Sequence, residues 1–158
     1  MRKFTLLLVL LMVSAASFAQ FEHGKKYIGA SLSSFDLSYN GLRNGNIGVN
    51  AKGGWLFADN LMLTGQVGYE KTKDVPADFT AGIGARYYII QNGVYLGAGC
   101  NYVHHSGYDD FMPTVQVGYA FFLSQTVTVE PEIYYNQSFK NHKDYSTIGL
   151  RIGFGIYL

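Results

Sequence analysis

The segment from His104 to Asp110 contains the residue types that enzymes use for nucleophilic catalysis. His104, Ser106 and Asp109 would supply the imidazole, hydroxyl and carboxylate of a hydrolase or acyltransferase triad. A triad holds these groups in a fixed chain of hydrogen bonds, and no motif in the segment provides such an arrangement. Residue types alone do not make an active site. We therefore predict that the chain has no catalytic residue and is not an enzyme.

The same segment, together with residues 137–145, could bind a metal ion. His104, His105, His142 and Asp144 carry nitrogen and oxygen ligands that divalent transition metals accept. Adjacent histidines on an extended chain point to opposite sides, so His104 and His105 cannot both face one ion. We predict no metal site and no cofactor, with a histidine and carboxylate metal site as the alternative.

Six further charged residues could form a network of ion pairs. Each lies on the polar side of a segment in which polar and apolar residues alternate. The six are Lys52, Arg86, Arg151, Glu70, Glu130 and Glu132. If the connection before the last strand is centred near residue 141, Glu130 and Glu132 flank Arg151 across a strand pair. Because the positive and negative charges are equal in number, the sequence predicts a neutral interior charge network.

The segment from Thr147 to Leu158 indicates which side is the interior. Every second residue from Ile148 to Leu158 is large and apolar, whereas Arg151 belongs to the other row, with three glycines. An arginine is costly in hydrocarbon, and a continuous row of Ile, Leu and Phe is not. The apolar row is therefore predicted to contact lipid. The alternative is a soluble, lipocalin-like carrier, which would need apolar residues inside.

Similar alternation recurs along the chain and predicts eight strands. The segments are 26–40, 46–57, 61–70, 78–90, 94–103, 111–123, 127–136 and 147–158. The apolar set changes phase in the first segment, which predicts a β-bulge near Ser33 and Ser34.

The connections between these segments alternate in length. Short polar turns at 58–60, 91–93 and 124–126 alternate with longer connections at 40–45, 71–77, 104–110 and 137–145. Outer-membrane barrels have short periplasmic turns and longer extracellular loops. The pattern predicts an all-β, eight-stranded, antiparallel, up-and-down transmembrane β-barrel with both termini in the periplasm.

The first residues have the pattern of a secretory signal peptide. A basic start at Arg2 and Lys3, an apolar run and a small residue at Ala19 predict a cleaved segment 1–19 and a barrel domain 20–158. Loss of Arg2 and Lys3 takes the formal charge from +1 to −1, so no basic block would attract nucleic acid. The single cysteine, Cys100, falls among outward residues and is interpreted as an apolar packing residue.

Two segments that flank predicted turns resemble a known family. Residues 54–63 and 118–127 resemble the turn-flanking pattern of small outer-membrane β-barrel proteins of the Bacteroidota "porin family" type, and more loosely the transmembrane domain of outer-membrane protein A. The resemblance implies a Gram-negative outer-membrane location and insertion by the barrel-assembly machinery. Such barrels commonly end in an aromatic residue, whereas this chain ends in Leu158.

These observations lead to one expected function and one alternative. We expect a monomeric, integral outer-membrane barrel with a packed polar interior and a structural or surface-interaction role, because eight strands enclose only enough space for their own side chains. The expected partners are outer-membrane lipid and lipopolysaccharide, with loop lysines at positions 71, 73, 140 and 143 near the anionic headgroups. The alternative is a narrow channel for ions or small solutes.

Overall fold

The computed structural model describes residues 21–38, 41–43, 47–71, 78–89, 93–105, 108–139 and 146–158. Its strands are β1 (Lys26–Ser38), β2 (Gly41–Arg43), β3 (Ile47–Ala58), β4 (Leu61–Lys71), β5 (Asp78–Tyr88), β6 (Val94–His105), β7 (Tyr108–Tyr119), β8 (Phe121–Phe122), β9 (Val127–Asn136) and β10 (Thr147–Tyr157). No helix long and apolar enough to cross a membrane occurs in these ranges. The predicted signal peptide lies outside them.

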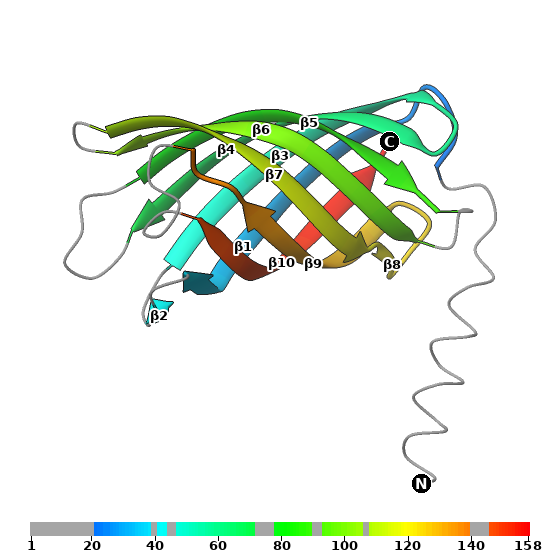
Figure 1. Ribbon diagram of the computed structural model, residues 1–158. Coiled ribbons are helices and arrows are strands. Elements are labelled where there is room, and N and C mark those ends of the chain that lie inside the picture. The colour runs from blue at the N-terminus through cyan, green and yellow to red at the C-terminus, as the bar shows by residue number, and fades with distance from the viewer. Residues whose placement is uncertain are drawn as a thin grey trace, which may run out of the picture.

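The strands form one closed antiparallel wall, as Figure 1 shows. Apart from β2, which pairs with β1, and β8, which pairs with β9, successive strands pair in chain order, and β10 closes the wall because it pairs with both β9 and β1. The strands β7 and β8 make one wall strand, since both pair with β9 in the same register. Their separation falls where β9 has Pro131, which cannot donate a ladder hydrogen bond. The predicted eight-stranded barrel is confirmed.

The predicted bulge in the first strand is also confirmed. Between β1 and β10 the register shifts from Ser33 opposite Arg151 to Phe35 opposite Leu150. An extra residue on one strand moves the following side chains to the other face. This explains why the apolar residues of β1 change phase along the sequence.

Two connections differ from their expected lengths. The strand β6 continues to His105 and β7 begins at Tyr108, so the third connection is much shorter than the predicted 104–110 loop. Polar residues such as His104 and Asp109 extend the ladder by pairing with each other, and their polarity had wrongly indicated a loop. The short strand β2 pairs with β1 inside the predicted first loop.

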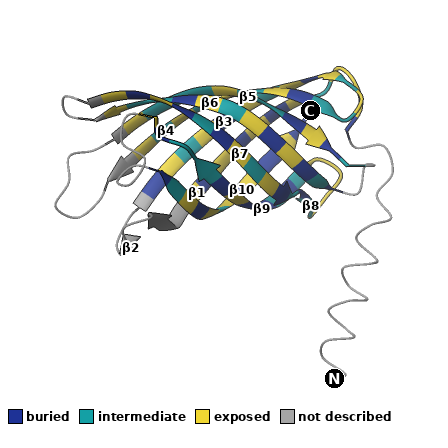
Figure 2. Cartoon of the chain, in the orientation of Figure 1, coloured by how far each residue is buried: buried dark blue, intermediate teal, exposed yellow. Residues whose placement is uncertain are grey.

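Burial alternates along the strands as expected for a lipid-facing wall (Figure 2). Ile83, Val117 and Ile152 are 76%, 51% and 58% exposed, whereas Arg86 is 1% exposed. The apolar row therefore faces outward and the charged row faces inward. Aromatic residues such as Trp55 and Phe154 near the turns, and Tyr69 near the loops, are exposed at the two ends of this apolar belt.

An arginine at mid-depth on the outer wall should oppose insertion. Ile152 lies in the middle of β10, and we expect Ile152→Arg to lower the free energy of unfolding in lipid vesicles by about 2–4 kcal/mol. Leu123→Arg is the matched control, because Leu123 is equally exposed but lies at the turn end, where the cost falls to about 0–1 kcal/mol. Denaturant titration with heat-modifiable gel migration measures both. Equal costs at the two positions would contradict a membrane-spanning wall.

Candidate functional site

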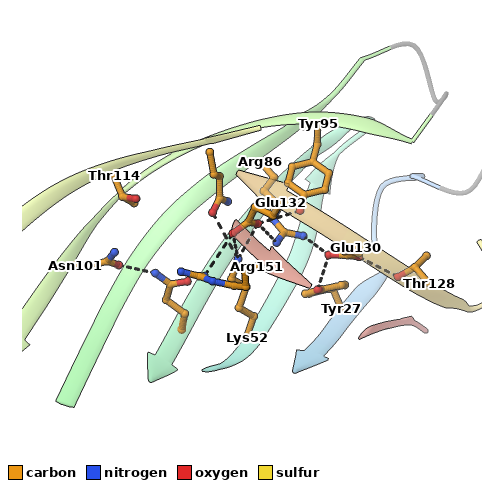
Figure 3. Close-up of polar contacts among 12 residues, drawn as sticks. Tyr27, Lys52, Arg86, Tyr95, Asn101, Thr114, Thr128, Glu130, Glu132 and Arg151 are labelled. Carbon is orange, nitrogen blue, oxygen red and sulfur yellow. Dashed lines mark hydrogen bonds and ion pairs between the residues drawn. The ribbon is translucent and has the colours of Figure 1, made fainter. Parts of the chain in front are cut away.

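The interior of the barrel contains a carboxylate that serves three cations. Glu132 on β9 lies 3.0 Å from Lys52 Nζ on β3, 3.0 Å from Arg86 Nη2 on β5 and 3.4 Å from Arg151 Nη1 on β10. Figure 3 shows these contacts converging from different parts of the wall. Lys52, Arg86 and Glu132 are each at most 6% exposed. One carboxylate therefore ties together strands that are far apart in the sequence.

A second carboxylate, Glu130, extends the network toward the turn end. It accepts hydrogen bonds from Arg86 Nη1 at 2.8 Å, from the Tyr27 hydroxyl at 2.8 Å and from Thr128 Oγ1 at 2.9 Å. The Tyr157 hydroxyl is a further donor at 3.1 Å. Both carboxylates are thus surrounded by donors, which is what buried charges require.

The register explains which predicted pairs form. Arg151 lies directly opposite Glu132 on the neighbouring strand, whereas Glu130 lies opposite Gly153. From the sequence we expect both glutamates to flank Arg151. Instead, Glu132 contacts Arg151 as well as Arg86, and Glu130 contacts Arg86. The backbone of Glu70 pairs with Asp78, but its side chain lies outside the described residues. The structure brings five of the six predicted residues into one network.

Tyrosine rings enclose the cations from the sides. The Arg86 guanidinium lies 4.2 Å from the centre of the Tyr95 ring and 5.3 Å from that of Tyr27. Arg151 lies 4.2 Å from the Tyr134 ring. Such contacts favour a cation that has lost its water. The Tyr95 hydroxyl also donates to Glu132 at 2.9 Å, so the ring both packs on Arg86 and satisfies its counterion.

Inward glycines provide the space for these large side chains. The Tyr95 ring lies against Gly118, and the Tyr27 ring lies against Gly29 and Gly155, where any side chain would collide with it. The glycines therefore serve packing in this interior. The space between Arg86 and the two carboxylates is a cavity of about 10 Å³, lined also by Ser31 and other residues of the network. A cavity of that size barely admits one water molecule.

Aromatic residues fill the barrel on the turn side of the charges. Phe21 is fully buried and stacks on Tyr88 with ring centres 3.8 Å apart, and its ring also meets Phe122 and Tyr157 edge-on. Its carbonyl accepts a hydrogen bond from the Asn60 amide at 2.9 Å. Phe21, which precedes β1, is therefore part of the interior.

The polar residues at the loop end form a small exposed cluster. His104 Nδ1 lies 2.5 Å from Asp109 Oδ1, and the Tyr102 hydroxyl donates to the same oxygen at 2.8 Å. Ser106, His142 and Asp144, and the side chain of His105, which the triad and metal hypotheses also name, lie outside the described residues. No group of three histidine, cysteine or acidic residues that could hold a metal ion occurs in the described part of the chain.

Sequence reasoning missed two residues of the interior. Tyr27 lies in the first strand, whose phase change obscured its inward position, although its alternation with Ile28, Gly29 and Ala30 was a usable signal. Phe21 precedes every strand and has no periodic neighbours, so no pattern indicated that it enters the barrel.

Removing the charge of Glu132 should destabilise the barrel strongly. In Glu132→Gln the three cations lose their shared counterion, and we expect the free energy of unfolding to fall by about 3–5 kcal/mol. Glu22→Gln makes the same chemical change at an exposed position and should change stability by at most about 1 kcal/mol. Denaturant titration in vesicles compares the two. A loss for Glu132→Gln no larger than for the control would show that the network carries little stability.

Comparison with known proteins agrees with this architecture. The outer membrane protein beta-barrel domain family matches residues 5–157. The N-terminal β-barrel domain of Pseudomonas aeruginosa OprF is similar in structure, with a TM-score of 0.67 and 13% identity over 86% of this chain and 98% of that chain. Neisserial surface protein A has a TM-score of 0.57 and 17% identity over 84% and 96% of the two chains.

A further structural relative supports the same fold. Pseudomonas aeruginosa OprG has a TM-score of 0.57 and 13% identity over 88% of this chain and 98% of that chain. No curated protein sequence matches the chain. At such low identity the structural relatives show the fold alone. The family match extends over nearly the whole sequence, and the chain therefore belongs to the outer membrane β-barrel domain family, as an integral protein of the outer membrane.

Proposed function

We propose that this protein is a closed outer-membrane barrel, with a packed polar interior and a structural or surface-interaction role without catalysis. The observation that carries the proposal is the bridging of Glu132 to cations from three strands, in an interior whose free space at that level is about 10 Å³. A hydrated ion cannot pass such a layer unless several buried ion pairs separate. Buried pairs resist separation, because each would leave an unpaired charge.

The proposal includes an orientation in the membrane. The longer connections face the cell exterior, and the tight turns and both termini face the periplasm, as is usual for this kind of barrel. The barrel is a monomer in contact with lipopolysaccharide. The barrel-assembly machinery inserts it into the outer membrane. The lysines at 73, 140 and 143, and the side chain of Lys71, lie outside the described residues.

A narrow conduit is the second candidate, and one observation favours it. On the loop side of the charges a polar cavity of about 50 Å³ is lined by Asn50, Thr80, Asn101, Asn136 and Arg151. This cavity could admit water or an ion from the loop end. It stops at the network, so conduction would require the ion pairs to rearrange.

Conductance separates the two candidates. Purified wild-type protein in a planar bilayer should give no steady current, because the charge layer and the aromatic layer at Phe21 both close the interior. Outer-membrane porin measured in the same bilayer is the control for sensitivity. A steady, large conductance from the wild-type protein would establish the conduit instead.

Labelling of single cysteines tests the orientation. In a Cys100→Ala background, Phe139→Cys at the loop end should react with a membrane-impermeant maleimide on intact cells, and Ser124→Cys at a tight turn should not. Both should react once the outer membrane is permeabilised, since both positions are exposed. Labelling of Ser124→Cys alone on intact cells would show that the barrel is inserted the other way round.

A further inference from the structure

The outer wall has one region where small residues replace the bulky apolar belt. The outward positions Gly53, Gly65 and Cys100 lie in one row across β3, β4 and β6, interrupted only by Ile83 on β5. The neighbouring row toward the loops contains Ala51 and Ala81, with Val67 between them. Elsewhere the outward residues include Leu, Ile and Phe on nearly every strand. The missing side chains leave an open, almost wholly apolar hollow of about 740 Å³ on the lipid side of the wall.

The hollow has a floor of small residues and sides of larger ones. A side chain added at Gly53 or Gly65 would meet no other atom within 4 Å, so the depth comes from absent side chains and not from a bend of the backbone. Phe111 and Tyr102 line the side nearer the loops, and Phe111 is 65% exposed. Trp55, the only tryptophan of the chain, is the next outward residue after Gly53 toward the turns.

The hollow extends from the middle of the wall toward the loops, since Gly53 and Gly65 lie near the middle of β3 and β4. Ala81 is close to the loop end of β5, which begins at Asp78, and Phe111 is close to the loop end of β7, which begins at Tyr108. With the proposed orientation, the part of the hollow toward the loops lies in the outer leaflet of the membrane. The main lipid of that leaflet is lipopolysaccharide.

A second copy of the chain would fit the hollow poorly. In a two-fold dimer the same patch of each copy faces its partner, so two hollows would meet and enclose a void. Atoms around a void lose contacts on one side, and no hydrophobic force between barrels compensates in lipid. A flexible hydrocarbon chain adapts to a concave surface, and the family membership of this chain already places the surface against lipid.

We infer that this hollow is a binding site for an acyl chain of lipopolysaccharide, held beside Phe111 and Tyr102 over the glycine floor, with Trp55 as the neighbouring outward residue toward the turns. The inference rests on the proposed orientation, which assigns the part of the hollow toward the loops to the outer leaflet. Bound chains exchange more slowly there than over the rest of the belt, and the contact fixes one face of the barrel toward a particular lipid.

Quenching of Trp55 fluorescence tests the site. The full barrel is refolded into phosphatidylcholine vesicles that contain either lipopolysaccharide or additional phosphatidylcholine with spin-labelled acyl chains. We expect stronger quenching by the lipopolysaccharide chains at equal label density. Gly65→Leu fills the hollow without a collision and should abolish this preference. Ala98→Leu is the matched control, because Ala98 is exposed on the same strand as Cys100 but does not line the hollow.

Each other outcome overturns a defined part of the inference. Equal quenching by both lipids in the wild type and in Gly65→Leu would mean bulk contact and no site. Stronger quenching by phosphatidylcholine, lost in Gly65→Leu, would show that the hollow binds an acyl chain of phosphatidylcholine and not of lipopolysaccharide. Oxidative cross-linking between Cys100 residues of two copies would show that a second copy covers the hollow. The cysteine labelling on cells reports the orientation separately, so failure of the orientation is distinguishable from failure of the site.

Discussion

The structure depends on one constraint, which is that ionisable side chains of the wall strands can face only a narrow interior. Hydrocarbon outside the wall excludes charge, and an eight-stranded barrel leaves an interior only wide enough for side chains. Cations from β3, β5 and β10 therefore meet within reach of the same carboxylate. The three cations share Glu132 because the narrow interior leaves little room for separate ion pairs or for water.

This constraint also explains the distribution of glycine and tyrosine. Tyrosine brings a large ring that packs and a hydroxyl that donates, so Tyr27 and Tyr95 fill space while they satisfy the carboxylates. Each ring needs a wall position without a side chain, and Gly29 and Gly118 provide such positions. The interior is thus built from large tyrosine side chains packed against glycines. It contains few of the branched apolar residues that fill soluble cores.

The sequence predicted the wall better than the interior. Alternation with period two fixed the strands, the bulge at Ser33 and the inward side of Lys52 and Arg86, because these depend on neighbours along the chain. The partner of each charge depends on side-chain reach across the interior, which no local pattern records, so Glu130 was expected at Arg151 but contacts Arg86. The burial of Phe21 could not be predicted for the same reason, since its contacts lie on distant strands.

With the closed interior that we propose, the question of function shifts to the outside of the barrel. Paired charges and rings that fill the remaining space leave little surface inside to recognise a ligand. The two surfaces that can differ between barrels of this fold are the loop end and the lipid-facing wall. On the wall, a continuous row of large apolar side chains contacts any lipid equally well. A region that selects one lipid must therefore be one where those side chains are missing. Gly53 and Gly65 mark such a region, and they still take part in strand pairing, because the ladder hydrogen bonds that hold the wall together do not depend on the outward side chains.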